Sequence, residues 1–478
     1  MATTQPSPRL NLSCLHAYQT RAIQHTTQRR QAMLWLDMGL GKTVVTLSAI
    51  AEKLDRLQIS GALVLAPLRV IQSVWRQEAA KWEHTKGLRF SLVSGTKDAR
   101  TRAALLPADV YLCNYENLTW LADCWTQYYL SRGRYLPVNM VVFDEITKGK
   151  NATAKRHEAL QRLTPFMPHR VGLTGTPASN GYQDLFGQYL AVDSGERLGT
   201  SKTAFMNQFF RPENPMSPFG KQKPTETAED LIESLVADIT IQMKAEDYIE
   251  LPEVLENELD IELPPSLMKK YKKLEDEMWV ELDSGHQIES FNAAALTNRG
   301  LQFAQGAMYL NPGAKQWESV HDLKLDALES VVNEANGKPA LIAIEYQHDA
   351  ERILKKYPGM VWVKSSMSGQ KFNQVLDQWE EGTLPGIIVH PASAGHGIDR
   401  LKNGPVDDVV WFGHTWSLDQ YEQLIARLKR QGRTRPIRLH HITARGTIEV
   451  AQRLALTAKA RSQDKLKEAL NEYRKAAA

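Results

Sequence analysis

The sequence lacks several features that mark other classes of protein. No run approaches the roughly 20 apolar residues that span a bilayer, and the opening MATTQPSPRLNLS has no apolar core of the signal-peptide type. The three cysteines, Cys14, Cys113 and Cys124, form no CxxC pair, which argues against a zinc site or a disulfide framework. We therefore expect a soluble, cytoplasmic protein from a reducing compartment.

The chain also lacks a strong charge of either sign. Its 58 basic and 55 acidic residues give a net charge of +3, which is too small to argue for nucleic-acid binding. The 42% hydrophobic and 24% charged residues are ordinary for a globular protein, and 478 residues are enough for two or three domains. No short-period repeat is present.

Short apolar runs alternate with amphipathic helical stretches near both ends of the chain. Continuous apolar strands separated by helices indicate parallel sheets covered on both faces. The strands expected in the first part cover residues 32–36, 62–65, 110–113, 140–143 and 171–173. Those in the last third cover residues 340–344, 361–363, 386–389, 409–412 and 438–442. Helices are expected between them, at residues 70–82, 349–356, 371–379 and 418–429.

The middle of the chain is richer in charge and in helix formers. We expect an N-terminal α/β lobe over residues 1–250, a helical insertion over 251–320 and a C-terminal α/β lobe over 321–478. A proline-rich stretch at 211–224 predicts an exposed loop. Charges alternate at helical spacing over 447–475, which predicts a solvated terminal helix on the second lobe.

The strongest local signal is DMGLGKT at residues 37–43, which follows one expected strand and opens a helix. Glycines there let the backbone approach phosphates, and the helix N-terminus directs N–H groups at an anion. Lys42 can reach the β- and γ-phosphates, and Thr43 can bind Mg²⁺. A strict GxxxxGK[ST] pattern would place a glycine at Leu36, so only its GxGKT core is present.

An acidic pair, Asp144 and Glu145, follows the strand expected at 140–143. The carboxyl edge of a parallel sheet is where such folds bind ligands. There Asp144 can hold Mg²⁺, and Glu145 can orient and deprotonate an attacking water. By itself such a pair is typical of a solvated turn, and it gains its catalytic interpretation from the phosphate loop.

Two further segments carry polar groups with more than one interpretation. Thr174 and Thr176 in GLTGTP can sense a γ-phosphate, or they can simply cap a turn. Arg427 and Arg430 in QLIARLKRQG lie three residues apart on one helical face. They can stabilise charge on a transferring phosphoryl group, or form a basic helix end that suits the helix dipole.

Together these segments resemble helicase superfamily II, and within it the Swi/Snf-type translocases, from about residue 15 to about residue 432. The matching segments are LHAYQ (15–19), DMGLGKT (37–43), LVLAPLRVIQSVWRQEAAKW (63–82), CNYENL (113–118), DEITKGKN (144–151), GLTGTPASN (172–180), ALIAIEY (340–346), SAGHGID (393–399) and QLIARLKRQG (423–432). The resemblance implies two RecA-like lobes, ATP and Mg²⁺ as cofactors, and a minimal member of phage or bacterial type.

The resemblance also implies roles for individual residues. Gln19 would read adenine, and the nucleotide would further contact Met38, Gly39, Leu40, Gly41, Lys42, Thr43, Val44, Gly397 and Asp399. Gln423 would couple the site to movement with Thr174 and Thr176, and Arg427 and Arg430 would complete catalysis. Nucleic acid would contact Arg69, Asn114, Tyr115, Ser393 and His396, although surface or core packing explains Arg69 and Tyr115 equally well. Three positions depart from the family: Ile146-Thr147 replaces Ala-His, Arg433 replaces glutamine, and His396 replaces glycine.

The function expected from this resemblance is ATP-driven movement along DNA, duplex or branched. The alternatives are an RNA helicase, a strand-separating DNA helicase, and a nucleotide-gated binding clamp with little hydrolysis. A small-molecule kinase would leave the second lobe and its arginines unexplained. No nuclease constellation is visible, so a nuclease activity would need a separately encoded partner.

Overall fold

The computed structural model describes residues 9–147, 154–178, 181–212, 222–284, 290–310, 316–364, 366–367, 369–394, 399–429, 433 and 435–457. The chain divides into two compact units, Met1–Ile249 and Glu250–Ala478. No described helix is both long enough and apolar enough to cross a membrane.

The first unit is built on a seven-stranded sheet in which every neighbouring pair is parallel. Its order is β3 (Phe90–Val93), β4 (Val110–Asn114), β2 (Ala62–Ala66), β5 (Met140–Asp144), β6 (His169–Thr174), β1 (Gln31–Leu36) and β9 (Thr240–Met243). Its helices are α1 (Ala17–Thr27), α2 (Lys42–Asp55), α3 (Trp75–Lys81), α4 (Lys97–Leu105), α5 (Leu118–Tyr128), α6 (Ala154–Leu163), α7 (Leu185–Asp193), α8 (Lys202–Phe209) and α9 (Ala228–Val236).

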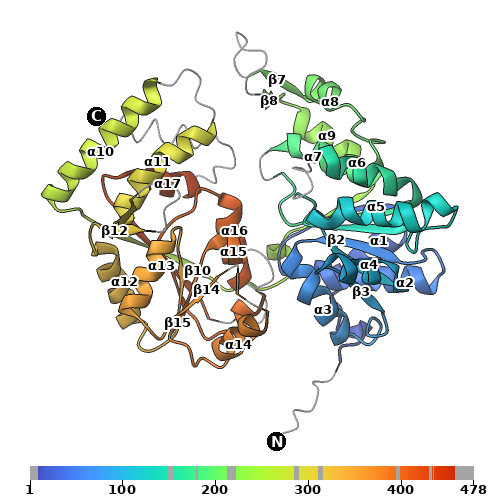
Figure 1. The fold of residues 1–478 in the computed structure, drawn as a ribbon, viewed down its shortest axis with the longest axis horizontal. Helices are drawn as coiled ribbons and strands as arrows, with labels where there is room; N and C mark the ends of the chain where they lie inside the picture. Colours follow the sequence, from blue (N-terminus) through green and yellow to red (C-terminus); the bar gives the residue numbers. More distant parts are fainter. Residues whose placement is uncertain are drawn as a thin grey trace, which may run out of the picture. The chain divides into compact units, whose positions relative to one another are not determined.

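Helices cover both faces of this sheet (Figure 1). Alternate strand residues such as Met33, Trp35 and Phe143 form one core cluster with α5, α6 and α7. Helices α1 and α2 lie on the opposite face. The proline-rich stretch begins and ends in a short antiparallel pair, β7 (Phe210–Pro212) and β8 (Gln222–Pro224). The described residues of this stretch, 211–212 and 222–224, therefore lie in strands and not in the loop that was expected.

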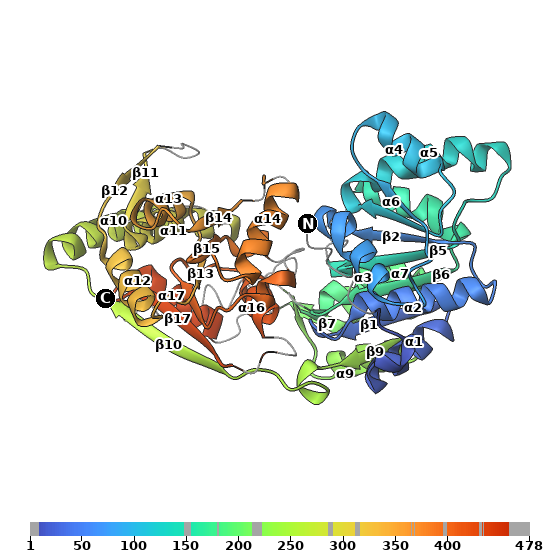
Figure 2. The same ribbon diagram turned by 90° about the horizontal axis from the view of Figure 1, so that it is seen from below.

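The second unit is built on a six-stranded sheet, again with only parallel pairs (Figure 2). Its order is β10 (Val254–Ile261), β17 (Ile437–Ala444), β16 (Asp408–Trp411), β13 (Ala340–Ala343), β15 (Gly386–Val389) and β14 (Val361–Val363). Its helices are α10 (Pro265–Ser284), α11 (Ser290–Gln305), α12 (Leu323–Glu334), α13 (Gln347–Lys356), α14 (Gly369–Glu380), α15 (Pro391–Ala394), α16 (Leu418–Leu428) and α17 (Ile448–Thr457).

Side chains alternate between the two faces of this sheet, as strand geometry requires. Leu341 and Trp411 belong to a cluster with α14 and α16. Ile342 and Val410 belong to another with α12 and α13. The two α/β lobes expected from the sequence are therefore confirmed.

Two expectations about the second unit need correction. The segment expected as a helical insertion holds the helices α10 and α11, but it also contributes β10, which pairs with β17 along its whole length, and a hairpin of β11 (Ala307–Tyr309) and β12 (Trp317–Ser319). Helix α17, the described start of the stretch expected as a solvated helix, is mostly buried; residues beyond 457 lie outside the described part.

A buried lysine ties the elements of the second unit together. Lys324 in α12 is fully buried and donates to the carbonyls of Phe412 and Ile442, at 2.8 and 2.9 Å, and to the carboxylate of Glu449 at 2.6 Å. All three protons of the ammonium group therefore have acceptors, which offsets the cost of removing the charge from water.

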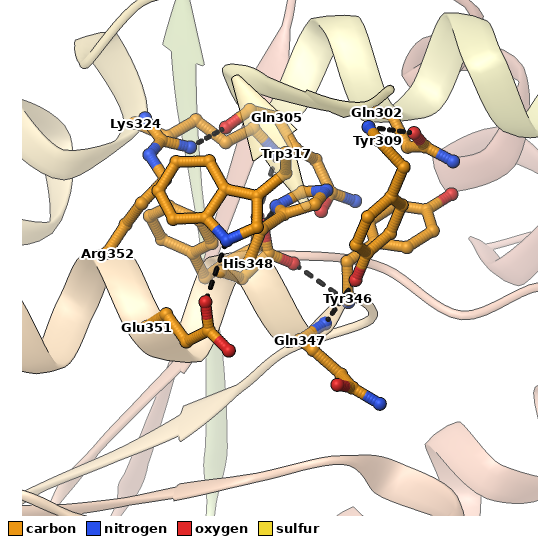
Figure 3. Close-up of polar contacts among 12 residues, drawn as sticks. Gln302, Gln305, Tyr309, Trp317, Lys324, Tyr346, Gln347, His348, Glu351 and Arg352 are labelled. Carbon is orange, nitrogen blue, oxygen red and sulfur yellow. Dashed lines mark hydrogen bonds and ion pairs between the residues drawn. The ribbon is translucent and has the colours of Figure 1, made fainter. Parts of the chain in front are cut away.

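Gly306 links α11 to β11 and has a φ of +95°, a left-handed conformation that residues with a side chain rarely adopt. A Cβ at this position would overlap the carbonyl oxygen of His321 and lie 2.7 Å from Nη2 of Arg352. Arg352 is buried and donates to the carbonyl of Gln305 at 2.7 Å, a bond drawn in Figure 3. Arg352 also donates to the carbonyl of His321, so neither neighbour can move away without breaking a hydrogen bond.

We therefore expect Gly306→Ala to lower the free energy of unfolding by about 3 kcal/mol or more. Gly337→Ala is the matched control, because Gly337 also has a positive φ, +79°, but a Cβ added there would meet no atom within 4 Å. It should cost only about 1–2 kcal/mol of backbone strain. Chemical denaturation measures both, and equal losses would contradict the steric argument.

Candidate active site

The phosphate loop connects the end of β1 to the start of α2. Gly39 and Gly41 have φ values of +92° and +79°, a region that costs residues with a side chain about 1–2 kcal/mol. The left-handed Gly41 is the N-cap of α2, which begins at Lys42. The first turn of a helix has N–H groups without acceptors inside the helix, a geometry suited to an anion, and Lys42, Thr43 and Val44 lie in that turn.

Gln19 lies directly against this loop. Its side chain in α1 donates to the carbonyl of Leu40 at 3.3 Å and accepts from the N–H of His16 at 3.0 Å. A Cβ on Gly41 would lie 2.5 Å from Nε2 of Gln19, so only glycine allows this approach. The structure thus brings Gln19 next to the loop, where the family resemblance places it.

The ammonium group of Lys42 lies at the carboxyl edge of the sheet. Its Nζ donates to the carbonyl of Leu36 at 2.8 Å and to that of Asp37 at 3.4 Å. Leu36, where the strict GxxxxGK[ST] pattern would have a glycine, is the last residue of β1 and is fully buried. Gly175, just after β6, lies beside the same lysine, because a Cβ there would be 3.4 Å from Nζ.

The acidic pair lies at the carboxyl end of β5, which is next to β6 in the sheet: Asp144 is the last residue of the strand, and Glu145 follows it. Asp144 is 8% exposed, and its Oδ2 accepts a hydrogen bond from the indole N–H of Trp75 at 3.0 Å. Glu145 has a φ of +55°, which is uncommon for a residue other than glycine. Strained backbone of this kind is concentrated at functional sites, where the surrounding structure holds it in place.

Thr174 and Thr176 lie at the end of the neighbouring strand β6. Thr174 is fully buried, and its Oγ1 accepts from the N–H of Thr176 at 3.0 Å. Residue Leu173 pairs with Asp144, and Thr174 pairs with Trp35. The threonines therefore lie between the strand that carries the acidic pair and the strand that leads into the phosphate loop.

The departure at Ile146 has a packing explanation. Ile146 is 2% exposed and packs against Gly172. A Cβ added to Gly172 would lie 3.0 Å from Cδ1 of Ile146 and 2.5 Å from the sulfur of Met33. The residue after the acidic pair thus packs into the core under β6.

Two of the expected nucleic-acid contacts in the first unit are buried. Tyr115 is 7% exposed, and its hydroxyl donates to the carbonyl of Asp144 at 3.0 Å. Asn114 is 6% exposed and donates to Glu116 at 2.6 Å. The hydroxyl of Tyr115 is therefore committed to the protein interior, which favours core packing, the alternative stated for this residue. Arg69 is partly exposed and precedes a π-helical turn, Val70–Val74, where a continuous helix was expected.

The second unit holds the remaining candidates, of which several lie outside the described residues: His396, Gly397 and Arg430. Arg427 is partly buried in the last turn of α16, and Gln423, one turn earlier, is 6% exposed and donates to Asp419 at 3.1 Å. Ser393 lies in α15, and Asp399 begins the short helix Asp399–Asn403.

Oxygen ligands of the kind that Mg²⁺ prefers are present in the first unit. Mg²⁺ in nucleotide sites is commonly held by one or two protein oxygens together with phosphates and water. Thr43 supplies a hydroxyl at the N-terminus of α2, and Asp144 supplies a carboxylate oriented by an indole N–H. The donor set therefore fits Mg²⁺ bound with a nucleotide.

Comparison with known proteins assigns the family. The model of the SNF2-related domain matches residues 18–306, which is more than half of the chain. The chain belongs to the SNF2-related family. The model of the helicase conserved C-terminal domain matches residues 323–432 of this SNF2-related protein.

Individual proteins are similar to this chain over most of its length. "Putative protein p41" of Acyrthosiphon pisum secondary endosymbiont phage 1 is 36% identical, over 95% of this chain and 98% of its own length. A "DNA repair and recombination protein RAD54-like" of Drosophila ananassae is 24% identical over 86% of this chain, which spans 56% of that relative. The solved "Sulfolobus solfataricus SWI2/SNF2 ATPase core in complex with dsDNA" matches 96% of both chains, with 21% identity and a TM-score of 0.42.

Trp75 is the functional candidate that the motif analysis did not single out. Its apolar spacing assigns it to the buried face of a helix, and it is indeed fully buried. The sequence does carry one indication of its role: a buried indole N–H usually needs a hydrogen-bond acceptor. Only the fold shows that this acceptor is Asp144.

Proposed function

We propose that this SNF2-related protein hydrolyses ATP and uses the energy to move along DNA, duplex or branched. The observation that carries the proposal is the convergence of Lys42, Asp144 and Glu145 at the carboxyl ends of strands in the sheet of the first unit. The names of relatives support DNA as the polymer, since one is a RAD54-like DNA repair and recombination protein.

The roles proposed for the chain's own residues follow from their chemistry. The N-terminus of α2 and Lys42 bind the phosphates of ATP, and Gln19 binds its adenine base next to the loop. Thr43 and Asp144 would hold Mg²⁺, which neutralises phosphate charge when bound. Glu145 takes the proton of the attacking water. The loss of the γ-phosphate is coupled to movement by Thr174, Thr176 and Gln423. The charge on the transferring phosphoryl group is stabilised by Arg427 and Arg430.

Movement requires that ATP binding and hydrolysis favour different conformations of the chain. A ligand shifts such an equilibrium only through contacts that differ between the two states. The γ-phosphate supplies those contacts, and hydrolysis removes them. We propose that DNA is held mainly through its phosphates, with Arg69, Ser393 and His396 among the contacts, so sequence preference is weak.

The test is the ATPase rate of the full chain with no nucleic acid, single-stranded DNA, duplex DNA, forked DNA and RNA. Duplex or forked DNA should stimulate turnover at least about tenfold more than RNA does. Stimulation should fall steeply as salt rises from about 50 to 200 mM, because phosphate contacts release counterions. Stimulation by RNA alone would replace DNA by RNA in the proposal, and nucleotide binding without turnover would favour a binding clamp.

A further inference from the structure

The carboxylate of Asp144 is held by a donor that is itself rigid. Trp75 is fully buried, and an indole N–H donates but never accepts, so the direction of its 3.0 Å bond to Oδ2 is fixed. Hydrogen bonds to an ionised acceptor are stronger than those between neutral groups. The bond therefore sets the plane of the carboxylate that would bind the metal.

The main chain of Asp144 is held by a second buried aromatic residue. The hydroxyl of Tyr115 donates to the carbonyl of Asp144 at 3.0 Å, just before the left-handed Glu145. The bond anchors the peptide that joins the two acidic residues.

The two donors come from separate segments of the chain. Trp75 follows the π-helical turn Val70–Val74, and Tyr115 follows β4. A π-helical turn inserts one residue into a helix and changes the direction of the side chains that follow it; such turns are frequent at functional sites. Here the turn immediately precedes the residue that reaches Asp144.

We propose that Trp75 and Tyr115 are positioning residues that set the geometry of Asp144 for a magnesium-bound nucleotide. The inference rests on the proposed function, because it requires Asp144 to hold the metal. Partners that orient a metal ligand commonly change metal affinity by about 10–100-fold when they are removed. Neither residue touches the nucleotide in this proposal.

The test measures binding of a non-hydrolysable ATP analogue to the full chain by calorimetry, over a series of Mg²⁺ concentrations and with EDTA. Mg²⁺ should increase the affinity for the analogue, and Trp75→Phe should raise the Mg²⁺ concentration that gives half of this increase about tenfold. Affinity in EDTA should stay unchanged. Tyr115→Phe, which removes a single hydroxyl, should produce a smaller shift in the same direction.

The chain offers matched controls for both variants. Trp125 is also fully buried and donates to the carbonyl of Ala104 at 3.0 Å, and Tyr111 donates to that of Leu106 at 2.7 Å. Trp125→Phe and Tyr111→Phe should lower the melting temperature without changing the Mg²⁺ dependence. The inference is overturned if Trp75→Phe leaves that dependence unchanged, or if Trp125→Phe shifts it equally. Wild-type binding that ignores Mg²⁺ would instead contradict the proposed function.

Discussion

Glu145→Gln is expected to lower ATP turnover by about a thousandfold while leaving ATP binding nearly intact. The amide has the size of the carboxylate but cannot take a proton from the attacking water, and general-base catalysis contributes about 10²–10⁴-fold. Glu145 is the residue after the end of β5, so the substitution leaves the phosphate loop unchanged. Single-turnover hydrolysis and equilibrium ATP binding measure the two effects separately.

Lys42→Ala provides the contrast, because it should weaken ATP binding as well as abolish turnover. Its ammonium group lies at the end of β1, where it would contact the phosphates. Lys97→Ala, at an exposed lysine that begins α4, is the control and should change neither property. An equal loss of nucleotide affinity in the Glu145 and Lys42 variants would contradict the separate roles.

Arg427→Ala and Arg430→Ala are each expected to lower DNA-stimulated turnover by at least about two orders of magnitude. An arginine that stabilises a transferring phosphoryl group is worth roughly 10³–10⁵ in rate. ATP affinity should change much less, because in the proposal the first unit binds the phosphates. Turnover with saturating duplex DNA, together with ATP binding, measures the difference.

Arg445→Ala is a control from the same unit. Arg445 is an exposed arginine paired with Asp260 at 2.8 Å, and such surface pairs contribute about 0–1 kcal/mol. Its turnover should remain normal. If a double variant at Arg427 and Arg430 also kept normal DNA-stimulated turnover, the second unit would have no part in hydrolysis, and a single-unit ATPase would be the better account.

The central strands could be predicted from the sequence, whereas several strands at the sheet edges could not. Strands β2 and β13 are buried and continuously apolar, and β5 is apolar up to its last residue, Asp144, so hydrophobicity alone reveals them. Strand β10 reads VLENELDI and is mostly exposed, and β9 reads TIQM, in which the glutamine is exposed. Such strands form because a partner strand lies beside them in the fold. The local sequence does not show which strand that will be.

The same distinction applies to the candidate site. Lys42, Asp144 and Glu145 lie in short motifs where strands end, so their types and spacing predict their place at the carboxyl ends of the strands. The bonds from Trp75 and Tyr115 to Asp144 join residues that are 69 and 29 positions apart. Spacing cannot predict contacts of this kind, because they depend on which strands become neighbours.

The central claim is movement along DNA driven by ATP hydrolysis, and a triplex-displacement assay tests it most directly. A motor that passes along a duplex pushes off a third DNA strand bound to that duplex. The full chain should displace that strand with ATP, but not with a non-hydrolysable analogue and not as the Glu145→Gln variant. Rapid DNA-stimulated hydrolysis without any displacement of the third strand would contradict the claim.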